Sequence, residues 1–160
     1  MSTMTTSTLL HDRLDSLYEV WQSLSPGSSS EDFKAFADFF SQDCTAWLLS
    51  MREHETPSIG RSGVIEGIQT AIQDSQIKAR RVLKRFTDVT GSTISCEMQN
   101  SLTVHGKPLD PLYETAVVAF NDQGFITDFK LYSCRSAIVA IIQDVTGVGP
   151  YERHNECHKL

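Results

Sequence analysis

The sequence predicts an α+β domain in which a curved antiparallel sheet wraps around helices gathered at the N-terminal end. Apolar residues recur at helical spacing up to Ile72, and the period then changes to two, which is typical of strands. Helices that precede an antiparallel sheet must cover one of its faces. A long sheet that covers three amphipathic helices curls into a cone, and the space left inside is expected to be a pocket.

Three helices are expected in the first half of the chain. The first spans Leu9–Leu24, where leucines and Trp21 recur three and four positions apart, and it ends at the turn 25–27. The second begins at Ser30, a favourable N-cap residue that two acidic residues follow. The third begins at Gly60 and carries isoleucines on one face. All three are amphipathic, so each has one face to bury.

Strands are expected around and after the third helix. A first strand is predicted at Cys44–Met51, and the polar segment Arg52–Ser58 that follows it is predicted to be a loop. The later strands are predicted at Arg80–Asp88, Ser92–Val104, Leu112–Phe120 and Phe125–Cys134. Their connections contain glycine, asparagine and proline in hairpin patterns, so neighbouring strands are antiparallel. A last helix is expected at Ser136–Val145.

The expected organisation is one domain over residues 9–146, between a flexible start at 1–8 and a loose tail at 147–160. The net charge of −6, with no basic cluster longer than Arg80–Arg81, argues against a nucleic-acid partner. No apolar run approaches the ~18 residues that span a membrane. The start lacks the basic and apolar parts of a signal peptide, and four widely spaced cysteines indicate free thiols. The protein is therefore expected in the cytoplasm.

Two polar residues stand in apolar rows of the predicted strands. Asn100 shares the parity of Met98 and its apolar neighbours, and Glu114 shares the parity of Ala116 and Val118. Removal of a carboxylate from water raises its pKa, which suits a general acid or base. Glu114 is therefore a candidate catalytic residue, and Asn100 a candidate pocket residue. The alternatives are a hydrogen-bonded core amide for Asn100, and a solvated strand end for Glu114, paired with a basic residue such as Arg81 or Lys130.

Further candidates lie on the last strand and in the first long loop. Asp128, Lys130 and Tyr132 share one face of the strand; Asp128 is a candidate base, and Tyr132 a candidate donor to a substrate carbonyl. The alternative for Asp128 and Lys130 is a solvated outer face. His54, in the loop after the first strand, is a candidate proton shuttle at the pocket mouth. The tail residues 154–158 lack a fourth ligand at usual spacing, so no metal is expected.

Three segments, at residues 39–47, 60–68 and 121–132, resemble the nuclear-transport-factor-2-like fold in their order and spacing. More narrowly, they resemble its SnoaL-like branch of small cyclases, isomerases and dehydratases. Residues 113–118 and 132–136 are similar to isomerases of fungal meroterpenoid and xanthone pathways. The branch places an aromatic residue where Tyr132 stands. It often has an acidic residue near the end of the last strand, where this chain has Cys134.

The resemblance implies a cofactor-independent isomerase of a fungal secondary-metabolite pathway that acts on a polycyclic polyketide or meroterpenoid. The predicted substrate contacts are Asn100, Trp47, Met98, Arg81 and Lys130. A dehydratase or cyclase in the same kind of pathway, or a non-catalytic binding or dimerisation module, are the alternatives. The outer face of such a curved sheet often packs against another subunit, so a homodimer is also expected.

Overall fold

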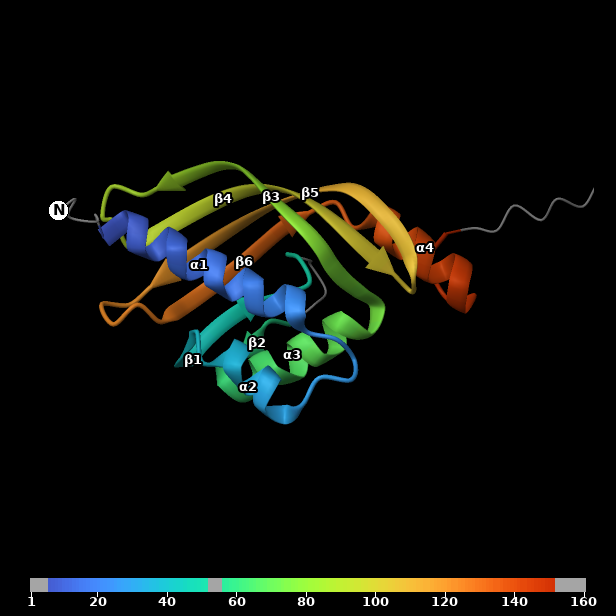
Figure 1. Ribbon diagram of the computed structural model, residues 1–160, viewed down its shortest axis with the longest axis horizontal. Helices are drawn as coiled ribbons and strands as arrows, with labels where there is room; N and C mark the ends of the chain where they lie inside the picture. Colours follow the sequence, from blue (N-terminus) through green and yellow to red (C-terminus); the bar gives the residue numbers. More distant parts are fainter. Residues whose placement is uncertain (1–5, 52–55, 152–160) are drawn as a thin grey trace, which may run out of the picture.

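The computed structural model describes residues 6–51 and 56–151, which form four helices and a six-stranded sheet. The sheet is curved but not closed, and it arches over three helices that lie against its concave side (Figure 1). The fourth helix stands apart at one end of the sheet (Figure 1). The predicted α+β class, with helices on one face of a curved sheet, is confirmed.

The helices lie close to their predicted positions. Helix α1 spans Thr6–Ser23 and α3 spans Gly60–Asp74. Helix α2 spans Ser30–Ala37, and its N-cap is Ser29, not Ser30 as predicted. The Ser29 hydroxyl accepts a hydrogen bond from the Asp32 amide at 3.2 Å, and the Asp32 carboxylate accepts one from the Ser29 amide at 2.8 Å. Adjacent serines cannot be told apart by sequence pattern, whereas this reciprocal capping box selects Ser29.

Three of the five predicted strands begin four or five residues earlier than predicted, and the other two begin one residue later. Their bounds are β1 Phe40–Trp47, β2 Ser58–Ile59, β3 Ser75–Thr87, β4 Thr93–Val104, β5 Lys107–Phe120 and β6 Ile126–Ser133. Strand β1 begins at Phe40, two residues after Asp38, the C-cap of α2, and four residues before its predicted start at Cys44. Strand β2 begins at Ser58, the last residue of the predicted loop, and pairs with β1 across two residues.

The sheet has the order β2-β1-β6-β5-β4-β3. Strands β3 to β6 form the predicted antiparallel meander. Strand β1 pairs in parallel with β6, so the expectation of a wholly antiparallel sheet is wrong at this one junction. The two strands are far apart in sequence and joined through α3 and the meander, a long crossover of the kind that parallel pairing needs.

Helix α4, at Ser136–Thr146, packs against the end of the sheet through the buried Ile138. The chain then turns at Gly147, which has a φ of +78°, and folds back along the helix. The buried Gln143 side chain accepts from the Tyr151 amide and donates to the Tyr151 carbonyl, both at 2.8 Å. Residues 147–151 are therefore attached, which corrects the expected loose tail over this part. None of the helices in the described part is long and apolar enough to cross a membrane.

Candidate functional site

The candidate site begins with a carboxylate on the inner face of the sheet. Glu114 on β5 accepts a hydrogen bond at Oε2 from Nδ2 of Asn100 on β4, at 2.6 Å. Asn100 is fully buried, as its place in the apolar row predicted, and Glu114 is half-buried. The bond occupies one of the two carboxylate oxygens and leaves the Asn100 Oδ1 without a partner. Since an ionised carboxylate only accepts hydrogen bonds, it fixes which way the amide points.

Glu114 lines a small cavity between the helices and the open end of the sheet. The cavity has a volume of about 40 Å³, and its wall is mostly apolar. The wall includes Trp21 from α1, Leu48 after β1, Leu131 from β6 and Ile138 from α4. This volume accommodates roughly three water molecules. It is well below the ~300–1,000 Å³ of typical ligand pockets.

The surroundings of Glu114 act on its pKa in opposite directions. Burial raises the pKa of Glu114, while the Asn100 hydrogen bond and the positive charge of Arg135 lower it. Burial is the largest of these effects, so the pKa lies above the ordinary value. A carboxylate whose pKa is raised towards neutrality can both remove and return a proton.

A tyrosine hydroxyl lies in the same interior region without a hydrogen-bond partner. Tyr18 on α1 is 1% exposed, and its hydroxyl oxygen is buried and unpaired. Burial and the nearby Glu114 charge raise the pKa of Tyr18 well above its ordinary value, so the phenol keeps its proton. The Ser133 hydroxyl on β6 is also buried and lies in register with Glu114, and its interaction with the Glu114 carboxyl lowers the pKa of Glu114 as well. Unpaired buried polar atoms are rare and mark places where water or a ligand belongs.

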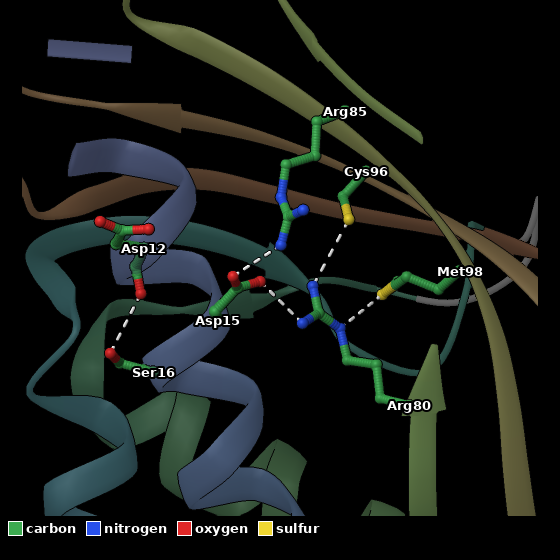
Figure 2. A network of polar contacts seen from close by, with 7 residues as sticks. All are labelled: Asp12, Asp15, Ser16, Arg80, Arg85, Cys96 and Met98. Carbon is green, nitrogen blue, oxygen red and sulfur yellow. Dashed lines mark hydrogen bonds and ion pairs between the residues drawn. The ribbon is translucent and has the colours of Figure 1, made fainter. Parts of the chain in front are cut away.

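The ring of Tyr18 is held between an aromatic side chain and a cation. It stacks on Trp21 with the ring centroids 5.3 Å apart. The guanidinium of Arg80 lies 4.4 Å from the Tyr18 centroid. Arg80 is in turn bound to Asp15 and to the sulfur atoms of Cys96 and Met98 (Figure 2). The phenol is thus fixed by its neighbours although its hydroxyl is unpaired.

Comparisons with known proteins address the fold. No protein-family model matches the sequence, and no curated protein sequence matches it significantly. Among solved structures, a candidate polyketide cyclase from Xanthomonas campestris pv. campestris superposes with a TM-score of 0.67 at 16% identity, over 85% of this chain and 98% of that one. A candidate isomerase from Bacillus subtilis gives 0.67 at 13% identity, over 94% and 100%. An NTF2-like protein from Anabaena variabilis gives 0.60 at 18% identity, over 84% and 94%.

The chain has the nuclear-transport-factor-2-like fold. The similarity covers most of this chain and almost all of each neighbour, so it concerns the whole domain. The resemblance that the three sequence segments indicated is therefore confirmed at the level of the fold. At identities below 20% it carries no residue roles.

Within this fold, only part of the predicted site set lies on the inner face. Glu114, Asn100 and Met98 point inward, and Met98 is opposite Glu114 in the β4–β5 register. Tyr132 is 46% exposed and lies on the outer face, because it alternates with the buried Leu131. The expectation that Tyr132 reaches the interior is therefore not met. It lines a shallow hollow of about 160 Å³ whose wall also includes Met98 and Glu114.

The remaining predicted residues are also away from the interior cavity. Asp128 and Lys130 form an ion pair at 3.3 Å at half-buried positions of the face that carries Tyr132. Arg81 is exposed and pairs in register with Gln99 on the outer face. Trp47 lines a groove of about 400 Å³ between β1, β2 and α3.

His54 lies outside the described residues, as does the tail sequence from His154 to His158. In the part of the chain that the structure describes, no group of three or more metal-ligating side chains could hold a metal ion.

Sequence reasoning missed two residues of the interior region. Tyr18 was part of the apolar stripe of the first helix, and nothing in that pattern distinguishes a packed ring from one whose hydroxyl is unpaired. Arg80 lies next to Arg81, and its register with Asn100 shows that it is the arginine that faces inward. Strand parity within 75–87 could have indicated Arg80, since it shares the parity of the half-buried Val82.

Proposed function

We propose that the chain is an enzyme that moves a proton within a small organic molecule bound in the interior of the cone. Glu114 serves as the general base and acid, Asn100 orients its carboxylate, and Tyr18 donates a hydrogen bond to a substrate oxygen. The finer assignment is a cofactor-independent isomerase of a fungal secondary-metabolite pathway, acting on a polycyclic polyketide or meroterpenoid. That assignment rests on the sequence resemblance.

One observation carries the proposal. A carboxylate with a raised pKa lies at the wall of an apolar cavity, hydrogen-bonded to a fully buried amide. Unpaired polar atoms of Tyr18 and Asn100 lie buried in the same region. Burial of a polar atom without a partner costs about 1–3 kcal/mol, which a purely structural core would avoid.

The reaction proceeds in two proton transfers. The Glu114 carboxylate takes a proton from a carbon next to a carbonyl, the C–H electron pair forms a carbon–carbon double bond, and negative charge moves onto the carbonyl oxygen. The Tyr18 hydroxyl donates to that oxygen and stabilises the enolate. The protonated Glu114 then returns its proton to a different carbon, so the product is an isomer of the substrate.

The size of the cavity restricts how a large substrate can bind. About 40 Å³ is too small for a polycyclic molecule. Such a substrate requires the wall formed by Ile138 and Leu48 to move outward, while its reacting end lies next to Glu114. Helix α4 is the part of this wall with the least support, because only Ile138 and Gln143 of the helix are buried.

Proton abstraction can be measured before the natural substrate is known. The protein is incubated in D₂O with a panel of cyclic ketones and fused-ring phenolic ketones, and deuterium incorporation next to the carbonyl is followed by mass spectrometry. We expect the natural protein to accelerate exchange on part of the panel, and Glu114→Gln to reduce this acceleration by at least about 100-fold, the usual contribution of a general base.

Asp128→Asn is the matched control, because it removes a carboxylate from the outer face of the same sheet. Exchange that Asp128→Asn reduces and Glu114→Gln leaves intact contradicts the proposal. A fold-preserving Glu114→Gln protein with full activity contradicts it as well. Product mass separates the alternatives, since loss of water indicates a dehydratase and an unchanged mass an isomerase or a cyclase that retains all atoms.

A non-catalytic binding or dimerisation module is the alternative from a different class. It predicts no exchange above background on any ketone and no effect of Glu114→Gln on the chemistry. The polar groups around the cavity favour the enzyme, because a module that only binds through its surface has no use for a buried carboxylate and an unpaired phenol.

We also propose that the protein forms a homodimer through the outer face of the sheet. Exposed aromatic and aliphatic side chains gather there, namely Leu83, Phe86, Tyr113 and Tyr132. Contiguous exposed apolar side chains on a folded domain mark an interaction surface.

A further inference from the structure

Arg80 has an unusual set of hydrogen-bond partners for a buried arginine. Its side chain is 8% exposed. It donates from Nη1 to Asp15 Oδ1 at 2.8 Å, from Nε to Met98 Sδ at 3.0 Å and from Nη2 to Cys96 Sγ at 3.4 Å (Figure 2). Sulfur is a weak, uncharged acceptor. Two of the three nitrogens of the guanidinium are thus satisfied without neutralising its charge.

Within residues 6–51 and 56–151, a single carboxylate pairs with Arg80, and it is shared with a second arginine. Asp15 Oδ2 accepts from Nη2 of Arg85 at 2.7 Å, while its Oδ1 accepts from Arg80 (Figure 2). Asp12, the next acidic residue on α1, is exposed, and its carbonyl oxygen accepts a hydrogen bond from Ser16. Two guanidinium groups against one carboxylate leave a surplus positive charge. Arg85 is 43% exposed and screened by water, so the surplus acts inside the protein mainly through Arg80.

The charge of Arg80 lies against the ring of Tyr18, whose hydroxyl has no hydrogen-bond partner. The guanidinium carbon is 4.4 Å from the centroid of the Tyr18 ring. A cation on the face of an aromatic ring is attracted to it and draws electron density from it, which makes the hydroxyl a better donor. Two other titratable groups oppose Arg80, since the charges of Glu114 on β5, the larger influence, and of the Cys96 thiol on β4 raise the pKa of Tyr18.

We propose that Arg80 is a positioning residue for Tyr18. Arg80 holds the ring in place, and its charge stabilises negative charge at the Tyr18 hydroxyl and on the substrate oxygen bound to it. The inference rests on the proposed function for one point, that Tyr18 meets a substrate oxygen. It supports the enolate route of the proposed function with a separate observation, the cation on the Tyr18 ring. A cationic intermediate at this position is disfavoured by the same charge.

The test needs no substrate, because the ionised Tyr18 phenol itself stands in for the negative charge. Difluorotyrosine is incorporated at position 18, since fluorine lowers the pKa of a phenol and brings its ionisation into an accessible range. The ionisation constant is read from the ultraviolet absorbance of the phenolate. Arg80→Met, which keeps an unbranched apolar stem and removes the charge, is expected to lower this constant by at least about tenfold.

Three further variants make the result specific. Arg80→Lys is expected to restore most of the constant, because it returns the charge without the planar group. Arg85→Met, the matched arginine that shares Asp15 but does not touch Tyr18, is expected to change it by less than about threefold. Asp15→Asn leaves Arg80 in place and removes its counter-ion, so it is expected to raise the constant even if Arg80→Met fails to fold.

An Arg80→Met constant within about threefold of the parent, or an equal effect of Arg85→Met, overturns the inference. So does a constant that falls in Asp15→Asn. Because no turnover is measured, this outcome is independent of the deuterium-exchange result: loss of the proposed base activity leaves the ionisation test intact, and the reverse also holds.

Discussion

At the scale of single residues, the interior of this fold combines groups that oppose one another energetically. Glu114 is half-buried in an apolar wall, the Asn100 side-chain amide donates a hydrogen bond to it, and the Tyr18 hydroxyl has no partner. Each arrangement disfavours the folded state relative to an apolar core. Functional sites commonly carry such destabilising features, and their removal tends to raise stability.

Glu114→Gln is therefore expected to stabilise the protein while it abolishes proton transfer. The folded pKa of Glu114 is raised above the unfolded value, so its stability contribution is present below the unfolded pKa and is lost as pH rises through the folded one. The gain from glutamine is expected to be on the order of 1 kcal/mol near pH 7.5 and to shrink towards pH 4. Urea unfolding at both pH values measures it, and equal stability at pH 7.5 contradicts the prediction.

His11, in the N-terminal half of α1, gives the stability of the protein a second dependence on pH. Its Nε2 lies 3.2 Å from the Thr87 hydroxyl, and its Nδ1 is buried without a partner. Burial and the charge of Arg85 lower the pKa of His11 below 6.5, although Asp15 and Asp12 partly oppose this. As pH falls below 6.5 the unfolded chain takes up the proton first, so the folded state loses stability.

The expected observation is a decrease of the urea midpoint between pH 7 and pH 5.5 that is smaller in His11→Gln. Glutamine keeps a hydrogen-bonding group near Thr87 and removes the titration. If the natural protein and His11→Gln lose the same stability between pH 7 and pH 5.5, the pKa of His11 is the same in the folded and unfolded states, which contradicts the prediction.

At the scale of elements, the ends of helices and strands were the parts that local pattern located least well. Strand β1 starts four residues before its predicted start, and β3 starts five residues before. The sequence from Ser75 to Ala79 has no clear alternation, and its strand character comes from pairing with β4. Element bounds depend on such partners, which a local window does not contain.

The start of α2 gives a matched test of one such bound. Ser29→Ala removes the hydroxyl that accepts from the Asp32 amide and breaks the capping box, so it is expected to cost about 1 kcal/mol of stability. Ser30→Ala, at the exposed first position of the helix, is expected to be neutral within about 0.5 kcal/mol. Chemical denaturation compares the two, and a larger loss in Ser30→Ala would place the cap one residue later.

At the scale of the whole molecule, the curvature of the sheet separates two surfaces with different uses. The inner face meets α1, α2 and α3 and carries Glu114 and Asn100, whereas the outer face carries exposed aromatic residues (Figure 1). The outer face also holds Asp128 and Lys130, which pair with each other. Mixed charges around exposed apolar groups are typical of the surface between protein subunits.

The proposed homodimer is expected to dissociate when charge is placed in this surface. Tyr113→Glu introduces a carboxylate at an exposed aromatic position next to Tyr132, and sedimentation equilibrium is expected to show at least about tenfold weaker association. Val148→Glu, at an exposed apolar position beyond α4, is the control and is expected to leave association unchanged. A natural protein that is monomeric at all concentrations tested contradicts the proposal.

The sequence by itself determined the class of the fold, the helices and the meander, because these follow from the period of apolar residues along the chain. It also placed Asn100 and Glu114 on the inner face, since strand parity is a local property. Parity could not say which face of β6 is inner for Tyr132, because both of its rows contain aromatic side chains.

Only the tertiary structure decided which inward groups meet. The contacts of Arg80 with Asp15 and with Tyr18 join a strand to a helix more than 60 residues away, and no spacing rule covers that separation. The parallel pairing of β1 with β6 and the small volume of the cavity arise in the same way. Such contacts depend on how the twist of the sheet packs against the helices, a property of the assembled chain that no segment carries alone.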